Sequence, residues 1–369
     1  MDFIHNKIVF LFHKPLTQVD GQTKYIKSLI DSLTTRYDVF IPSENYFMSN
    51  RKVIKFWIIR TLMVNIYLLK WILKNNRILN NEFTICIMED RYIMIPTYLL
   101  LTKAHIKFIS RVSDWGEDYI SSLEYKHFFQ LYLMRCLNSI YEKFVKEYSD
   151  CIIVPSEFLY TRIQMDYKKK IFVFLQPYQL LTKSKPTSTC MTNFIDKNHD
   201  IYCIFVGNYN YKPNADSADF IINVLINQLS KVDKKIKILL VGDAGMEKYS
   251  KYNSENLLVL GLVPDMSWIY DKCHIGLNPS LAIGGASIKN IEYLVNGMYV
   301  VTTPESSKGV IKTINSVVCD RKDFSHVICQ LADKVRHNIN PDKDEIEKIR
   351  RYYSKSIITS ELMKFLESD

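Results

Sequence analysis

The segment Ile283-Gly-Gly-Ala-Ser-Ile-Lys-Asn-Ile-Glu-Tyr-Leu294 lies between two short apolar stretches, Ile275–Asn278 and Tyr299–Thr302. The apolar stretches have the length of buried strands, and the segment between them has the periodicity of a helix over 288–295. A strand, a helix and a second strand in this order form the unit of a parallel sheet with a right-handed crossover. The segment therefore predicts an α/β fold for this part of the chain.

The same alternation of strands and helices runs through most of the chain. In the first half, strands are expected at 7–12, 37–41, 83–88, 107–110 and 151–154, and helices at 23–33, 53–73, 96–101 and 128–148. In the second half, further strands are expected at 202–206, 236–241 and 257–260, and further helices at 217–229, 266–272 and 344–366. The Ser-, Thr- and Lys-rich stretch 178–199 has the composition of a linker. We therefore expect an α/β fold with two Rossmann-like, doubly wound domains that face a central cleft.

Composition and charge restrict the classes of protein to which the chain can belong. Hydrophobic residues make up 47% and charged residues 24% of the 369 residues, which is the balance of a folded protein. The formal net charge of +9 suits anionic partners, such as nucleotide phosphates, nucleic acid or an acidic membrane face. The sequence has neither a signal-peptide pattern nor an apolar run of about 18 residues. The eight cysteines form no CxxC pair, so we expect free thiols and a cytoplasmic location.

The start of the helix expected over 288–295 is the most informative feature of the sequence. Free backbone amides and the positive end of the helix dipole favour an anion at such a position. Lys289 lies within the first turn and adds a full positive charge. We expect the anion to be held by Gly284, Gly285, Ala286, Ser287 and Lys289.

Glu292 follows about one turn later on the same helix. A carboxylate can accept hydrogen bonds from both hydroxyls of a ribose, and each such charge-assisted bond contributes about 1.5–3 kcal/mol. A capped helix with an exposed glutamate is the simpler interpretation of this residue alone. The anion site and the diol acceptor occur together, however, and together they describe a pocket for a nucleoside diphosphate.

Two loops that follow predicted strands add to this pocket. Gly207 and Asn208 come directly after a strand, and the missing Cβ of Gly207 lets the backbone approach a ligand closely. Lys212 supplies a cation near the same rim, unless it is the solvated lysine of an ordinary turn. In the later loop, the backbone of Val263 can contact a base edge, and Asp265 is expected to cap the helix that follows.

Three motifs resemble one family in their order and spacing. They are Phe205-Val-Gly followed by Pro213-Asn, then Gly261-Leu-Val-Pro-Asp265, then the run from Gly284 to Pro304. Over about 200–310 they are similar to the donor-binding half of GT-B glycosyltransferases, in particular glycosyltransferase family 4, the group 1 transferases. The resemblance implies an acceptor-binding domain over 1–185, a nucleotide-sugar donor-binding domain over 195–349, and a last helix (about 350–369) that crosses back to the first domain.

The resemblance also implies an activity, which is the retaining transfer of a sugar from a UDP-, GDP- or ADP-linked donor. Glu292 matches the second glutamate of the family's Glu-(seven residues)-Glu motif, the one expected to hold the ribose. Gly284 stands where the first glutamate of that motif would be. Gly21 lies where a first-domain loop approaches the diphosphate, and Asp114 lies where the family often has a polar residue facing the sugar.

The implied chemistry needs cations rather than a side-chain base. Lys212 and Lys289 would stabilise the charge of the departing diphosphate, whose own oxygen can accept the proton of the acceptor. No essential metal is expected. The sequence does contain Asp342-Lys-Asp344, but these acidic residues begin a predicted helix. Acidic side chains are common at a helix start, because they interact favourably with the positive end of the helix dipole.

The stretch 51–81 contains seven basic residues and no acidic residue, together with many large apolar side chains. One interpretation is a basic amphipathic helix that lies on an anionic membrane, which would suit a lipid-linked acceptor. The other interpretation is a first-domain helix packed on its sheet. The sequence leaves both open, and the acceptor is a glycan, a protein or a lipid.

Three other functions fit part of the sequence. A nucleic-acid-binding protein would fit the net charge, but the basic residues are spread out and no known binding module is present, so no nucleic acid is expected. A catalytically degenerate GT-B protein that binds a nucleotide or a partner would fit the glycine at position 284. A sugar-nucleotide epimerase would share the two-domain fold.

Overall fold

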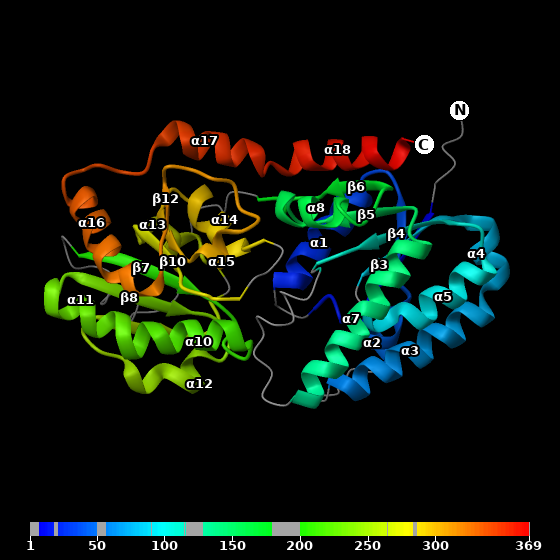
Figure 1. Ribbon diagram of the computed structural model, residues 1–369, viewed down its shortest axis with the longest axis horizontal. Helices are drawn as coiled ribbons and strands as arrows, with labels where there is room; N and C mark the ends of the chain where they lie inside the picture. Colours follow the sequence, from blue (N-terminus) through cyan, green and yellow to red (C-terminus); the bar gives the residue numbers. More distant parts are fainter. Residues whose placement is uncertain are drawn as a thin grey trace. The chain divides into compact units, whose positions relative to one another are not determined.

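The computed structural model describes residues 7–17, 21–49, 57–89, 91–113, 115, 128–178, 200–263, 265–282 and 286–368. The chain divides into two compact units (Figure 1). The first unit comprises Met1–Pro177 together with Lys355–Asp369, and the second comprises Tyr178–Ser354. Each unit contains one six-stranded sheet in which all described pairs are parallel, so the expected α/β fold with two doubly wound sheets is confirmed.

The sheet of the first unit has the strand order β2-β1-β3-β4-β5-β6. Its strands are β1 (Lys7–Leu11), β2 (Asp38–Phe40), β3 (Phe83–Glu89), β4 (Lys107–Arg111), β5 (Cys151–Val154) and β6 (Lys170–Val173). The inner strands are runs of buried Ile, Val, Phe and Cys, as expected for strands covered on both faces. The chain adds β2 on one side of β1 and all later strands on the other side.

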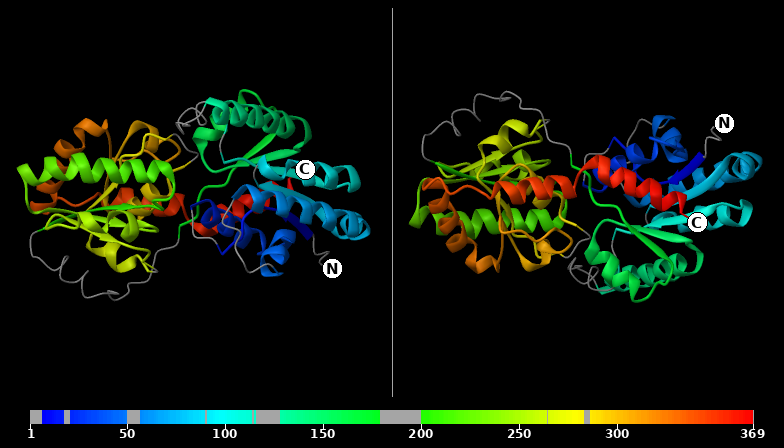
Figure 2. Two further views of the ribbon diagram at one scale, coloured as in Figure 1. Left: turned by 90° about the horizontal axis from the view of Figure 1, so that it is seen from below. Right: turned by 90° about the horizontal axis from the view of Figure 1, so that it is seen from above.

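Helices cover both faces of this sheet (Figures 1 and 2). One apolar core lies between the sheet and α2 (Pro42–Ser49), α3 (Trp57–Lys74), α4 (Asn76–Glu82), α5 (Met94–Lys103), α7 (Phe128–Tyr148) and α8 (Glu157–Gln164). A second core lies between the opposite face and α1 (Gly21–Leu33) and α18 (Lys355–Glu367). Thr359 of α18 donates to Ser32 of α1 at 2.8 Å, so the end of the chain belongs to the first unit.

The single helix expected over 344–366 is two helices, α17 (Lys343–Tyr352) in the second unit and α18 in the first. The break lies at Tyr353, whose buried side chain accepts a hydrogen bond from the backbone N–H of Ile311. The carbonyl of Tyr353 accepts from the backbone N–H of Tyr178 at 2.9 Å. These tertiary contacts end α17, and no proline or glycine in the sequence marks the place.

The sheet of the second unit has the order β12-β11-β10-β7-β8-β9. Its strands are β7 (Ile201–Val206), β8 (Ile236–Val241), β9 (Leu257–Leu260), β10 (Ile275–Asn278), β11 (Tyr299–Thr302) and β12 (Ser316–Val318). Its helices are α10 (Lys212–Phe220), a π-helical turn (Ile221–Leu225), α11 (Ile226–Val232), α12 (Gly245–Tyr249), α13 (Ser267–Lys272), α14 (Ile288–Val295), α15 (Pro304–Ser307), α16 (Phe324–Arg336) and α17. The predicted bounds of β10, α14 and β11 are confirmed.

The helix expected over 217–229 begins five residues earlier, at Lys212, and continues through the π-helical turn to Val232. Pro213 occupies the first turn of α10, where its missing N–H removes no helical hydrogen bond. Proline is therefore part of this helix start, although the sequence pattern places it in the preceding loop. Lys212, which the sequence pattern places in a loop, is the first residue of α10.

A buried ion pair lies at the carboxyl ends of β3 and β4 in the first unit. Arg111 donates to Glu89 at 2.6 Å, and the two side chains are 3% and 0% exposed. Gln22, in the first turn of α1, donates to the same carboxylate oxygen at 3.0 Å. The Arg111 guanidinium also lies 4.1 Å from the ring centroid of Tyr25. The pair therefore ties α1 to the two central strands.

Replacing Glu89 with glutamine is expected to destabilise the first unit by about 3–5 kcal/mol, because it leaves the buried Arg111 guanidinium without its carboxylate. Urea unfolding followed by circular dichroism measures this change. The matched control is Glu82→Gln, which breaks the exposed Lys7–Glu82 pair and should leave the urea midpoint unchanged. Equal midpoints for the two variants would contradict the role assigned to the buried pair.

Candidate functional site

The candidate site lies in the second unit, at the carboxyl ends of β7 and β10. The sheet is built outward from β7, with β8 and β9 on one side and β10, β11 and β12 on the other. In open α/β sheets, ligands bind outside the carboxyl ends of the strands at the point where the strand order reverses. The loop after β7 begins with Gly207 and Asn208, and the loop after β10 runs from Pro279 to Ser287.

Two glycines bring the loops after β7 and β8 into close contact. Gly207 donates its backbone N–H to the carbonyl of Val241 at 3.0 Å. Gly242 has φ +138°, and a Cβ placed there would lie 1.9 Å from the carbonyl oxygen of Gly207. Asn208 stabilises the next turn, since its side-chain oxygen accepts from the backbone N–H of Asn210 at 2.9 Å. The carboxyl ends of β7 and β8 are therefore followed by closely packed backbone.

Lys289 extends from the first turn of α14 to the start of α10. Its Nζ donates to Oδ1 of Asn214 at 2.8 Å and lies 4.3 Å from the ring centroid of Phe205. Burial lowers the pKa of Lys289 to about 7, and the nearby carboxylate of Glu292 opposes part of this shift. The Lys289 amine thus contacts a neutral amide and an aromatic ring, and a bound anion would raise its pKa.

Glu292 lies one turn further along α14 and is half-buried. Its carboxylate accepts a hydrogen bond from the hydroxyl of Tyr270 at 3.0 Å. Burial, followed by the charge of Glu292, raises the pKa of Tyr270 well above its ordinary value, so the hydroxyl stays protonated and donates. Tyr270, on α13, therefore fixes the orientation of the Glu292 carboxylate.

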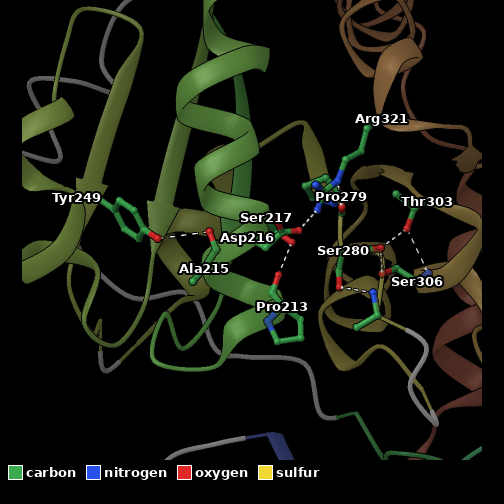
Figure 3. A network of polar contacts seen from close by, with 11 residues as sticks. Pro213, Ala215, Asp216, Ser217, Tyr249, Pro279, Ser280, Thr303, Ser306 and Arg321 are labelled. Carbon is green, nitrogen blue, oxygen red and sulfur yellow. Dashed lines mark hydrogen bonds and ion pairs between the residues drawn. The ribbon is translucent and has the colours of Figure 1, made fainter. Parts of the chain in front are cut away.

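The start of the loop after β10 is held by hydrogen bonds to its backbone (Figure 3). The carbonyl of Ser280 accepts from the hydroxyls of both Thr303 and Ser306. The carbonyl of Pro279 accepts from Nε of Arg321 at 2.6 Å. Arg321 also forms an ion pair with Asp216 of α10. Side chains from distant parts of the sequence thus fix the path of this loop.

The end of the same loop is held by a buried network of amides. Asn278 donates through Nδ2 to the hydroxyl of Ser287 at 2.8 Å and to Oδ1 of Asn290 at 2.9 Å. Asn290 in turn donates to the carbonyl of Ser306 at 3.0 Å. Because Asn278 and Asn290 are almost fully buried, this network determines where α14 begins.

The structure brings several of the expected site residues to one edge of the second unit. Ala286 and Ser287 precede α14 and are half-buried, and Lys289 and Glu292 follow on the helix. Gly207 and Asn208 follow the neighbouring strand β7. Lys212 is exposed at the first residue of α10, two residues before Asn214.

The remaining expected residues are placed differently. Val263 is half-buried in the loop after β9, whose Gly261 carbonyl accepts from the backbone N–H of Gly242. Gly21 belongs to the first unit, as the first residue of α1. Asp114, Gly284 and Gly285 lie outside the described residues.

Two acidic residues have the helix-start role that the sequence predicts. Asp265 accepts from the backbone N–H of Ser267 at 2.8 Å, at the first residue of α13. Asp342 accepts from the backbone N–H of Glu345 at 2.8 Å, which makes it the N-cap of α17. Within the described parts of the chain, no group of three or more His, Cys, Asp or Glu side chains is arranged to hold a metal ion.

Sequence reasoning missed the residues that support the site. The role of Asn290 could have been predicted from the sequence, because a buried amide within an apolar helix face requires polar partners. Asn214 belongs to the Pro213-Asn motif, but the motif did not reveal its contact with Lys289. Tyr270 and Arg321 carry no signal in the sequence, because their roles depend on contacts between segments far apart in it.

Comparison with known proteins shows which sequence family the second unit resembles. Residues 200–334 match the sequence profile of the family described as "Glycosyl transferases group 1". A Klebsiella pneumoniae protein described as "Uncharacterized 44.6 kDa protein in cps region" is 28% identical over 120 residues. That match covers 30% of this chain and 31% of the relative, so it spans about a third of the relative's length.

Solved structures match the fold over nearly the whole chain. The sucrose-phosphate synthase of Thermosynechococcus elongatus has a TM-score of 0.74 at 12% identity, with 98% of each chain covered. HepE of Anabaena, solved in complex with UDP-glucose, has a TM-score of 0.71 at 13% identity and covers 99% of this chain and 100% of its own. WaaG, a glycosyltransferase involved in lipopolysaccharide biosynthesis, has a TM-score of 0.67 at 11% identity, with 98% and 100% covered. The fold is thus that of GT-B glycosyltransferases, and the second unit carries the group 1 sequence pattern.

Replacing Arg321 with methionine is expected to free the start of the loop after β10, because the Pro279 carbonyl loses its charged donor. Hydrogen exchange of the backbone amides of residues 280–282 should accelerate at least tenfold, as the loss of a charged hydrogen bond implies. Mass spectrometry of peptic fragments measures this exchange. The control is Lys322→Met, whose side chain is 78% exposed. Unchanged exchange in the Arg321 variant would contradict the anchoring role.

Proposed function

We propose that this chain, whose residues 200–334 match the group 1 glycosyl transferases, is a glycosyltransferase that takes a sugar from a nucleoside diphosphate donor. The observation that carries the proposal is the juxtaposition of Lys289 and Glu292 on the first two turns of α14, at the reversal point of the sheet. A cation at a helix N-terminus suits a diphosphate, and a carboxylate fixed by Tyr270 suits a ribose diol.

The donor is proposed to lie along the edge formed by β7, β9 and α14. The diphosphate would contact the first backbone amides of α14 and the lysines, and the ribose would contact Glu292. The base would lie near the backbone of Val263. Gly207, Asn208 and the small residues from Gly284 to Ser287 would line this path, since small side chains let backbone amides reach the ligand.

In the proposed reaction, the bond between the anomeric carbon and the β-phosphate oxygen breaks, and its electron pair leaves with the diphosphate. Lys289, Lys212 and the α14 amides stabilise the charge that develops there. The acceptor hydroxyl forms the new bond from the face that the diphosphate leaves, and its proton passes to the departing phosphate oxygen. The configuration at the anomeric carbon is therefore retained. Gly21 and Asp114 are proposed to contact the diphosphate and the sugar from the first unit.

The first unit is proposed to bind the acceptor, which is a glycan, a protein or a lipid. UDP-glucose is the first donor to test, because HepE was solved with it and has the same fold. A hexosyl donor linked to GDP or ADP is the alternative.

We place the reaction in the cytoplasm. Cysteines 86, 136, 151, 203, 273, 319 and 329, which are the ones that the structure describes, are all free thiols. Burial raises the pKa of Cys151 to about 11 and that of Cys319 to about 11, so both stay protonated and unreactive. Free thiols of this kind are typical of a reducing compartment.

Replacing Glu292 with glutamine is expected to weaken binding of UDP-glucose by about 10- to 100-fold, because one or both charge-assisted bonds to the ribose become neutral. Ligand-observed NMR across UDP-, GDP- and ADP-sugars measures binding. The control is Glu347→Gln on α17, where the carboxylate is 69% exposed. Equal affinities of the two variants would overturn the ribose assignment.

The same samples distinguish an enzyme from a degenerate protein. Turnover of one donor with an acceptor, with the anomeric coupling constant of the donor preserved in the product, supports retaining transfer. Nucleotide binding without turnover of any donor would instead favour a degenerate nucleotide-binding protein, and acceptor-independent isomerisation an epimerase.

Affinity for UDP-glucose is expected to fall as the pH rises through about 7. The diphosphate of UDP-glucose stays fully ionised in this range, so the titrating group is Lys289, with its pKa of about 7. Below that pH the lysine is charged before binding. Above it, binding must take up a proton, and Kd should rise up to tenfold per pH unit. Isothermal titration calorimetry in buffers of different ionisation heat measures both the Kd and the proton uptake.

The control variant for this pH dependence is Lys289→Arg, because arginine keeps its charge throughout the range. Its Kd should be nearly independent of pH between 6 and 8. A pH dependence as steep as that of the unchanged protein would show that another group titrates.

A further inference from the structure

The helix α3 presents apolar side chains on two opposite faces. Its inner face contributes Val64, Leu68 and Ile72, which are fully buried in the core of the first unit. Its outer face carries five large apolar side chains that are 39–60% exposed, namely Ile59, Leu62, Met63, Ile66 and Leu73. Their spacing of three, four and seven residues places them in one line along the helix. We call this line the outer stripe of α3.

The outer stripe is unusual for the surface of a helix packed on a sheet. Such a helix normally has polar residues on the face away from the core, and a helix that is apolar all round is normally buried all round. Among the described elements, the sheet, α2 and α5 pack against the inner side of α3. Exposed apolar side chains scattered singly need no explanation, but five of them on one face of a helix indicate a surface that contacts something.

Basic side chains flank the outer stripe. Lys70 and Lys74 are exposed on α3 next to Leu73, and Arg77 is exposed on α4. No ion pair involving these three is found among the described residues. The helices α3 and α5 contain no acidic residue, and Glu82, at the end of α4, is paired with Lys7. The surface is therefore both apolar and positively charged.

These two properties decide between the possible occupants. A second copy of the chain would bury the stripe, but a twofold interface on it would bring the same lysines of both copies together, which is unfavourable. An anionic lipid bilayer satisfies both properties, since acyl chains accept the apolar line and the headgroups attract the lysines. Among the described helices, none combines the length and the apolar character needed to cross a membrane. The contact would thus be interfacial.

We infer that the outer stripe of α3, with Lys70, Lys74 and Arg77, docks the first unit on an anionic membrane surface. The residues 51–56 that precede α3 lie outside the described residues. If the proposed function is correct, docking keeps the first unit at the membrane surface, where a lipid-linked acceptor is available. The docking itself does not depend on the proposed function.

The test is partition of the full chain into vesicles, measured by co-sedimentation. Vesicles of phosphatidylcholine with 30% phosphatidylglycerol are compared with vesicles of phosphatidylcholine alone. Binding is expected to the anionic vesicles and to weaken as salt increases. The variant Lys70→Gln/Lys74→Gln should lower the partition coefficient about 30-fold. The variant Leu62→Gln/Ile66→Gln should lower it at least tenfold.

Matched control variants lie in the second unit. Val232→Gln/Ile339→Gln removes exposed apolar side chains, and Lys322→Gln/Lys334→Gln removes exposed charges. These variants should bind vesicles like the unchanged protein. Circular dichroism and UDP-glucose binding check that every variant folds.

Three results would overturn the docking. They are no binding to any vesicle, equal binding to both compositions, and equal losses in the stripe variants and the control variants. Sedimentation velocity is expected to show no self-association that depends on the stripe, and such self-association would assign the stripe to a second copy instead. Failure of UDP-glucose to bind any form of the chain would count against the proposed function and leave the docking result standing.

Discussion

The candidate site depends on a hydrogen bond between two buried asparagine side chains, Asn278 at the end of β10 and Asn290 within α14. A buried amide without a partner costs about 1–3 kcal/mol, so the pair strongly favours one placement of the helix against the strand. Through Asn290 the network continues to the carbonyl of Ser306, and through Asn278 to Ser287, directly before the helix. Lys289 and Glu292 take their positions from α14, and the proposed pocket takes its geometry from this network.

The electrostatics of the two sheets differ at the carboxyl ends of their strands. In the first unit, Arg111 and Glu89 neutralise each other at the carboxyl ends of β4 and β3, inside the unit. In the second unit, the Lys289 amine contacts the amide of Asn214 and the ring of Phe205, and burial lowers its pKa. The first arrangement stabilises a structure, whereas the second favours a ligand that brings negative charge. A site organised before the ligand arrives needs little rearrangement when charge develops during a reaction.

Local sequence patterns predicted the elements whose limits are set locally. The bounds of β10, α14 and α7 follow from the length and periodicity of their apolar residues. The anion site could be proposed from the sequence because its expected residues are consecutive. The division of 344–366 at Tyr353 could not, because a buried side chain and a strand-like contact with Tyr178 make the break. The support from Tyr270 and Arg321 was also invisible, since it arises from packing between distant segments. The edge strands β6 and β12 were not predicted from the sequence.

A crystal structure of the protein with UDP-glucose would show directly where the donor binds. We expect diphosphate oxygens within hydrogen-bonding distance of the backbone amides at the start of α14 and of Nζ of Lys289, with the ribose hydroxyls against the carboxylate of Glu292. Nucleotide bound at another place, or a ribose without contact to Glu292, would contradict it.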